Sequence, residues 1–204
     1  MKMRKVLSAL LVAACTLSLA ACGSSSSKSE TTGASGETAA GSANTAKVID
    51  VDLTSEEYAF GVDKTQPELL EQTNTFIQKI KDDGTLDAIC AKYFGDGEPE
   101  AVESAELDSS KDQLVVATNA AFEPFEYTKG DQYYGIDMEI AKLLADELGK
   151  ELVIQNMDFD AVCLSVSQQK CDIAMAGLTI NEEREEYVTF TDSYYSASQR
   201  LIVP

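Results

Sequence analysis

The stretch LVVATNAAFEPF, residues 114–125, is the clearest indication in the sequence of how this chain folds. Its first five residues, Leu114 to Thr118, form an apolar run rich in β-favouring side chains, which predicts a buried strand. The polar and aromatic residues that follow, Asn119 to Phe125, predict a loop at the carboxyl end of that strand. In parallel sheets, loops at this position carry ligand-binding side chains.

Downstream of this stretch, short apolar runs alternate with amphipathic segments. Residues 137–148 predict a helix that Gly149 ends, and residues 160–169 predict a second helix. Residues 152–155 and 172–176 predict strands. Strands that alternate with helices indicate an α/β fold, with a mostly parallel sheet flanked by helices. The segments expected at the carboxyl ends of its strands are 119–125, 157–159 and 177–184.

The segment AGLTINEER combines several groups that suit a small carboxylate. Gly177 lets a ligand approach the backbone closely, Thr179 offers a hydroxyl, and Arg184 can present a planar fork to a carboxylate. The alternative is a capped surface helix on which Arg184 pairs with Glu182 or Glu186. The segment is therefore a candidate carboxylate site whose arginine has two possible roles.

Residues 48–97 form a second structured stretch, which precedes the one just described. Alternating residues early in it predict a strand, and two helices are expected to begin near Thr65 and Thr85, whose hydroxyls can cap them. Residues 98–112 are acidic and rich in small side chains, and predict a linker that leads to residues 113–204.

The amino terminus is typical of an export signal. Residues 1–21 have a positively charged start followed by an apolar stretch that ends in small residues. Because Cys22 directly follows Leu-Ala-Ala, we expect a lipoprotein signal whose cleavage leaves Cys22 lipid-modified; an ordinary secretory signal is the alternative. Residues 22–47 are rich in Ser, Thr, Gly and Ala, and predict a disordered tether between lipid and folded domain.

Composition excludes several classes of function. The chain has 16 Lys and Arg against 35 Asp and Glu, a formal net charge of −19, and no His. The negative charge argues against nucleic acid as a partner, because phosphate binding needs a clustered positive surface. The lack of His excludes Ser-His-Asp and Cys-His catalysis and removes the commonest zinc ligand. We expect no metal and no cofactor.

Three cysteines, Cys90, Cys163 and Cys171, remain after the predicted signal and the lipid-modified residue. None of them has metal-ligand spacing. We expect partly buried free thiols, with a Cys163–Cys171 disulfide as the alternative.

Six motifs occur in an order typical of one family. They are LVVATNAAFEPF (114–125), GIDMEIA (135–141), FDA (159–161), CDI (171–173), GLTINEER (177–184) and FTDSYY (190–195). With them, the chain resembles the extracellular solute-binding proteins, family 3, of polar amino-acid ABC importers. The resemblance implies a lobe of the type II periplasmic-binding-protein fold.

The resemblance also implies roles for individual residues. Arg184, Thr179 and the backbone at Gly177 would hold the α-carboxylate of an amino acid. Phe122 and Phe159 would sandwich its side chain, the alternative for both being core packing.

Asn119 lies where the family often places a residue that selects the ligand side chain. Several basic-amino-acid binders have an acid there, so the amide weakens the case for Lys or Arg as ligand and leaves polar neutral or acidic amino acids open.

The order of the segments differs from that of the family. Residues 48–97 resemble the family's carboxyl-terminal end but precede its amino-terminal motifs, so we expect a permuted lobe. The chain stops at Pro204, where the family continues into a second lobe, so we also expect a truncated frame or fragment.

The resulting expectation is a monomeric, lipid-anchored protein on the extracytoplasmic face of the cell membrane. It would capture an amino acid and deliver it to ABC permease subunits. One alternative is an enzyme of dehydratase or lyase type, for which Glu123 is the acid predicted beside the site. The other is a single lobe used for sensing or protein interaction.

Overall fold

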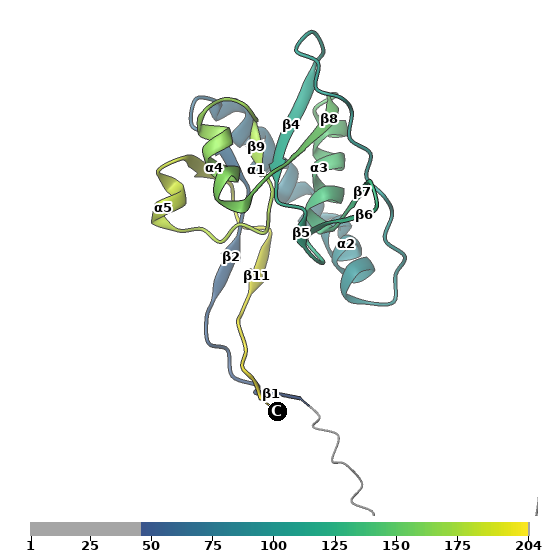
Figure 1. The fold of residues 1–204 in the computed structure, drawn as a ribbon, viewed down its shortest axis with the longest axis vertical. Coiled ribbons are helices and arrows are strands. Elements are labelled where there is room, and N and C mark those ends of the chain that lie inside the picture. Colours follow the sequence, from purple (N-terminus) through teal and green to yellow (C-terminus); the bar gives the residue numbers. More distant parts are fainter. Residues whose placement is uncertain (1–45, 204) are drawn as a thin grey trace, which may run out of the picture. The chain divides into compact units, whose positions relative to one another are not determined.

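Five strands form the central sheet of the computed structural model, which describes residues 46–203 (Figure 1). β4 is parallel to β8 and to β9, whereas β3 is antiparallel to both of its neighbours. Four strands therefore point in one direction, which confirms the mostly parallel α/β sheet predicted from the sequence. In spatial order the strands are β10 (Val188–Phe190), β3 (Gly61–Asp63), β9 (Ile173–Ala174), β4 (Gln113–Thr118) and β8 (Glu151–Asn156).

The predicted signal segment 1–21, the lipidation site Cys22 and residues 22–45 of the predicted tether lie outside the described residues. Within the described range, no helix has both the length and the apolar character needed to cross a bilayer.

The strand that runs against the others, β3, comes from the segment at residues 48–97. It lies between β9 and β10, with Val62 opposite Ile173 on one side and Thr189 on the other. Val62 is fully buried. This early part of the chain therefore supplies an internal strand of a sheet whose other strands follow it by at least fifty residues.

Helices cover both faces of the central sheet (Figure 1). Because side chains alternate along a strand, Val116 and Ile173 point to one face while Ala117 and Ala174 point to the other. The first face packs against α1, α2 and α3, and the second packs against α4. The helices are α1 (Pro67–Asp82), α2 (Thr85–Phe94), α3 (Ile136–Glu147), α4 (Phe159–Ser167) and α5 (Glu182–Glu185).

The predicted capping roles of Thr65 and Thr85 are wrong. The cap position of α1 is Gln66, and the Thr65 hydroxyl instead donates to Asp63 Oδ1 at 2.8 Å. α2 follows Gly84, whose φ of +80° places it in the left-handed region, so Thr85 is already the first residue of the helix. Thr65 therefore precedes the cap position of its helix and Thr85 follows that of its own, so neither threonine is the cap residue.

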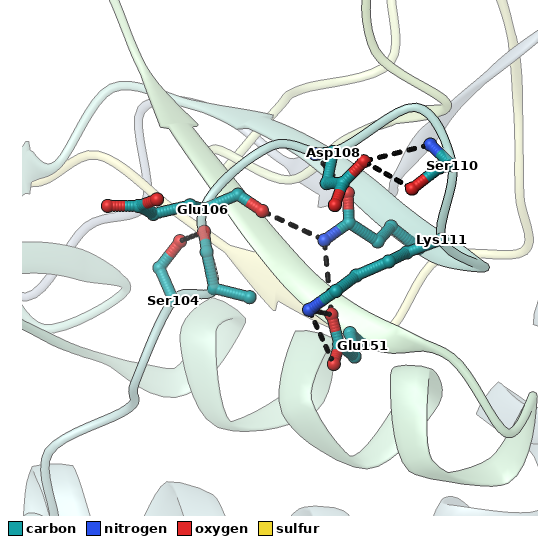
Figure 2. A network of polar contacts seen from close by, with 8 residues as sticks. Ser104, Glu106, Asp108, Ser110, Lys111 and Glu151 are labelled. Atoms are coloured by element: carbon teal, nitrogen blue, oxygen red, sulfur yellow. Dashed lines mark hydrogen bonds and ion pairs between the residues drawn. The ribbon is translucent and has the colours of Figure 1, made fainter.

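Residues 98–112, predicted to be a linker, lie along the edge strand β8. The Ala105 N–H donates to the Leu152 carbonyl at 2.8 Å, and the Ile154 N–H donates to Ser104 Oγ at the same distance. Figure 2 shows the polar contacts that hold the end of this segment, with Lys111 paired to Glu151 at 3.0 Å. The segment therefore covers much of an edge that would otherwise expose unpaired backbone groups.

Two further sheets adjoin the central one. A small antiparallel sheet consists of β5 (Ala121–Phe122), β6 (Glu126–Lys129) and β7 (Gln132–Tyr134). A ribbon, which we define as residues 47–58 and 195–203, leaves the central sheet as two antiparallel pairs (Figure 1). Its strands are β2 (Glu56–Tyr58) with β11 (Tyr195–Ala197), and β1 (Lys47–Val48) with β12 (Ile202–Val203).

Cys90, Cys163 and Cys171 are free thiols in the described part of the chain, as predicted, and the alternative Cys163–Cys171 disulfide is not formed. Cys163 and Cys171 are buried, and burial raises the pKa of each thiol.

Candidate functional site

The three segments predicted to carry the site meet beyond the carboxyl ends of β4, β8 and β9. Asn119 Nδ2, after β4, donates to the Met157 carbonyl, after β8, at 2.7 Å. Phe122 lies against Gly177, after β9, because a Cβ built on that glycine would be 3.0 Å from the Phe122 ring. The topology of the sheet therefore places these loops side by side, as the alternation of strands and helices predicts.

Arg184 is held within this group by contacts that leave its charge uncompensated. Its Nη1 donates to the Thr179 carbonyl at 2.8 Å, and its guanidinium carbon lies 5.1 Å from the centroid of the Phe159 ring. Across residues 46–203, no carboxylate lies within 4.0 Å of the guanidinium, so the predicted alternative of pairing with Glu182 or Glu186 is not observed. A half-buried arginine without an ion-pair partner can accept an anionic ligand.

Phe122 and Phe159 expose aromatic surface rather than packing into the core. Their side chains are 44% and 40% exposed, although both residues are large and apolar. Phe122 stacks on Phe125, with ring centroids 5.5 Å apart. Phe159, at the start of α4, is covered on one side by Arg184. Both rings are therefore available to a ligand, and the core-packing alternative does not hold for either of them.

Gly177 has a role that differs in part from the prediction. Its φ of +51° lies in the left-handed region, and a side chain there would meet the Phe122 ring, so the position favours glycine. Its N–H, however, donates to Asp137 Oδ2 at 2.9 Å. The N–H of Gly177 is therefore already occupied by the Asp137 carboxylate.

Thr179 lies between a cation and an anion. Its carbonyl accepts from Arg184, and its hydroxyl donates to Glu56 Oε2 at 3.3 Å. Glu56 belongs to the ribbon strand β2 and is more than a hundred residues away in the sequence. No local sequence pattern connects Glu56 with Thr179, so sequence analysis missed it.

The Asn119 side chain is used partly by the fold. Its amide nitrogen is bound to the Met157 carbonyl, while no described residue donates to its Oδ1. Asn119 therefore offers an acceptor to a ligand. Glu123, the acid considered for an enzyme, is exposed on the neighbouring loop.

Two buried carboxyl groups lie behind Gly177. Glu126 on β6 is 1% exposed and Asp137 at the start of α3 is fully buried. Burial raises the pKa of both, and the nearby charge of Asp137 raises that of Glu126 further. Hydrogen bonds from the Gly177 N–H and the Tyr194 hydroxyl partly offset the effect at Asp137. Among the described residues, Glu126 Oε2 has no hydrogen-bond partner.

Because Glu126 is buried, we expect the free energy of unfolding of the chain to fall as pH rises. Its pKa in the unfolded chain is 4.5, whereas the folded chain retains the proton to higher pH, so raising the pH above 4.5 favours the unfolded state. Glu126→Gln removes this penalty. We expect the variant to be about 1–3 kcal/mol more stable than the wild type at pH 7 and about equal to it near pH 4, in urea unfolding.

Glu123→Gln is the matched control for this comparison. It makes the same chemical change on an exposed side chain three residues earlier, and is expected to alter stability by less than about 0.5 kcal/mol at either pH. If the curves of unfolding free energy against pH are parallel for Glu126→Gln and the wild type, Glu126 is ionised in the folded chain and the interpretation is wrong.

A pocket of about 220 Å³ lies beside Phe159 and Arg184 of the candidate site. Cys163, Tyr187 and neighbouring residues complete its lining. Ligand pockets usually have roughly 300–1,000 Å³. This pocket alone is therefore too small to enclose a typical ligand, and the exposed faces of the two phenylalanines extend the site beyond it.

Comparison with known proteins relates the later part of this chain to one family. Residues 114–204 match the model of the bacterial extracellular solute-binding proteins, family 3. The arginine-binding extracellular protein ArtP of Bacillus subtilis is 37% identical over 95 residues, which are 47% of this chain and 37% of that protein. The histidine-binding periplasmic protein of Salmonella typhimurium is 30% identical over 92 residues, covering 45% of this chain and 35% of that protein.

Among solved structures, the arginine-bound form of domain 1 from TmArgBP, of T. maritima, shares 38% identity with this chain. The match covers 44% of this chain and 74% of that domain, with a TM-score of 0.40. The chain spans little more than a third of the length of the curated relatives described above. Residues 114–204 of this chain therefore have the sequence features of the bacterial extracellular solute-binding proteins, family 3.

Proposed function

We propose that this chain is the lipid-anchored, extracytoplasmic solute-binding component of an ABC importer, and that it binds a polar amino acid through the α-carboxylate. The observation that carries the proposal is the half-buried Arg184 guanidinium, which no described carboxylate neutralises. A carboxylate is the planar, bidentate anion that a guanidinium binds best.

The surroundings of Arg184 support a zwitterionic ligand. Thr179 separates the positive charge of Arg184 from the negative charge of Glu56. An α-amino acid carries a carboxylate and an ammonium group on one carbon, so its charges complement this pair. In the proposed pose the carboxylate lies at Arg184 and the backbone N–H of Thr179, and the ammonium group lies towards Glu56.

The side chain of the ligand is assigned to the two exposed aromatic rings and to Asn119. Phe122 and Phe159 would contact its apolar part, and Asn119 Oδ1 would accept a hydrogen bond from its end. The amide at position 119 favours a polar neutral amino acid such as glutamine, whereas the names of the relatives favour arginine or histidine. Both classes therefore belong in the test.

The sequence and the family likeness support a lipid anchor and a permease partner as parts of this proposal. Cys22 after the predicted signal 1–21 would carry lipid, and the amino acid would pass to ABC permease subunits, with the binding protein acting as a monomer. Intact mass of the membrane-extracted protein tests the anchor, because a diacylglyceryl group on Cys22 adds a defined mass.

Calorimetric titration of the full chain with glutamine, glutamate, arginine and histidine tests the proposed function. We expect saturable binding of at least one of them, and no heat from the matching compounds that lack the α-carboxylate. If none of the four amino acids binds while the protein is folded, the binding proposal is wrong for this chain and the interaction alternative takes its place.

Glu56→Gln tests the orientation of the ligand. The substitution removes the negative charge next to Thr179 and is expected to weaken amino-acid binding about 10- to 150-fold, as loss of one charged hydrogen bond does. The measurement is the dissociation constant by calorimetry, for the amino acid and for its analogue without the ammonium group. The analogue should bind both proteins equally.

Glu57→Gln is the matched control for this substitution. Glu57 is the next residue of β2, it is exposed, and its Oε1 accepts from Ser196 at 2.8 Å. It should leave affinity unchanged within about twofold. Equal losses for the two variants would show that Glu56 acts only through the general charge of the ribbon.

A further inference from the structure

Asp137 forms hydrogen bonds to two separate segments of the chain, one at Gly177 and one at Tyr194. Its Oδ2 accepts the N–H of Gly177 at 2.9 Å, and its Oδ1 accepts the hydroxyl of Tyr194 at 2.5 Å. Gly177 follows β9 in the candidate site, while Tyr194 directly precedes the ribbon strand β11. Both carboxylate oxygens of a fully buried side chain are therefore committed to the backbone of the site and to the base of the ribbon.

Tyr194 is held firmly at its own end of this connection. Its ring stacks on Phe60 with centroids 4.3 Å apart, and its N–H donates to the Tyr58 carbonyl at 2.9 Å. Burial and the charge of Asp137 raise the pKa of Tyr194, so the hydroxyl keeps the proton that it donates. The hydroxyl is thus a fixed donor that restrains the Asp137 carboxylate.

Gly177 connects these hydrogen bonds of Asp137 with the residues of the candidate site. The Phe122 ring packs directly against the position of Gly177, and the next residues of the chain lead to Thr179. A change in the position of the Gly177 backbone would therefore move both an aromatic wall of the site and the residue that lies between Arg184 and Glu56.

We propose that Asp137 is a positioning residue of the amino-acid site, which fixes the Gly177 backbone and couples it to Tyr194 at the base of the ribbon. The effect on amino-acid binding rests on the proposed function, whereas the hydrogen bonds of Asp137 can be tested without a ligand. Asp137 does not touch the amino acid. It acts by holding the segment that does, and it links that segment to the strands that leave the central sheet.

Tyr194→Phe tests the coupling. It removes one hydroxyl, keeps the stack on Phe60 and leaves Gly177 itself unaltered. Amide hydrogen exchange is measured by NMR on the ligand-free full chain, as the rate at Gly177 divided by the rate at Val116, a buried amide of β4. We expect this ratio to rise about tenfold, because Asp137 loses the donor that orients its carboxylate.

Tyr195→Phe is the matched control. It makes the same chemical change one residue further on, on a half-buried tyrosine in the ribbon, and the exchange ratio is expected to stay within about twofold of wild type. An unchanged ratio in Tyr194→Phe, or equal increases in the two variants, would overturn the proposal.

Asp137→Asn adds a second variant with nearly the same volume. Its side-chain oxygen can accept from the Gly177 N–H but is neutral, and a neutral acceptor binds more weakly than a carboxylate, so we expect the exchange ratio to rise above that of wild type. If this variant unfolds, the result with Tyr194→Phe still decides.

The binding arm separates this inference from the proposed function. With glutamine and arginine as probes, Tyr194→Phe should raise the dissociation constant about 3- to 10-fold, while Tyr195→Phe leaves it unchanged. If wild type binds neither probe, the proposed function fails for these ligands, and the exchange ratio still tests the contact. If wild type binds and Tyr194→Phe binds equally well, the positioning role is wrong.

Discussion

Replacing Arg184 with Ala is expected to weaken amino-acid binding by about 2–5 kcal/mol, or roughly 30- to 5,000-fold in dissociation constant. The reason is that the ligand carboxylate would be left in the site without its charge partner. The guanidinium is positioned before a ligand arrives, by the Thr179 carbonyl and the Phe159 ring, so little ordering cost offsets its contribution. Calorimetric titration with the amino acid that binds wild type measures the loss.

Two controls make this result specific. Arg184→Lys keeps the charge but not the planar fork, and should give an intermediate affinity. Arg200→Ala removes a ribbon arginine that is already paired with Asp50 and Asp52, and should change binding by less than about 0.5 kcal/mol. If Arg184→Ala binds as tightly as wild type while remaining folded, the site assignment is wrong.

A chain that begins at residue 98 is expected to lose its cooperative fold. The deletion removes β3, an internal strand, so β10 loses its partner and β9 is left with an open edge. It also removes α1 and α2, which cover one face of the sheet. The buried side chains lost include Phe60, Val62, Phe76, Ile77, Ile80 and Ile89. Burying one such side chain contributes about 1.5–3 kcal/mol, so the summed loss is comparable with the whole net stability of an ordinary domain, about 5–15 kcal/mol.

Circular dichroism and urea unfolding measure the outcome. The chain from residue 98 should show no cooperative transition, whereas a chain from residue 46, which keeps every described element, should retain one. Adding residues 46–97 as a separate peptide should restore the transition, because β3 then pairs from a second chain. Cooperative unfolding of the chain from residue 98 alone would show that the early segment is not part of the folding unit.

Much of the lobe could be predicted from the sequence because its signals are local. The apolar run at residues 114–118 is β4, and the helix predicted at 137–148 overlaps α3 almost completely. The three loops expected at the carboxyl ends of the strands do meet, since parallel strands bring these ends to one edge of a sheet. The predicted caps of α1 and α2 were wrong because an aspartate two residues before each threonine, Asp63 or Asp83, accepts a hydrogen bond from it in the turn that precedes the helix.

The carboxylates of the site were missed for a different reason. Asp137 lies on the same face of α3 as Ile140, Ala141 and Leu144. An acid within an apolar stripe of a predicted helix could therefore have indicated a buried carboxyl group. Glu126 and Glu56 have no comparable signal. Each becomes important only through a neighbour on another element: Asp137 and Gly177 for Glu126, and Thr179 for Glu56.

The sequence by itself determined the alternation of strands and helices and the family motifs, and it made Arg184 a candidate carboxylate ligand with two possible roles. Periodicity and residue type suffice for these conclusions, because they depend on neighbours within one or two turns of chain. Only the tertiary structure decided that β3 lies between β9 and β10 and runs against them, that Arg184 is free of Glu182 and Glu186, and that the Gly177 N–H belongs to Asp137. Each of these depends on which of several available partners a group meets in space, and packing of the whole chain makes that choice.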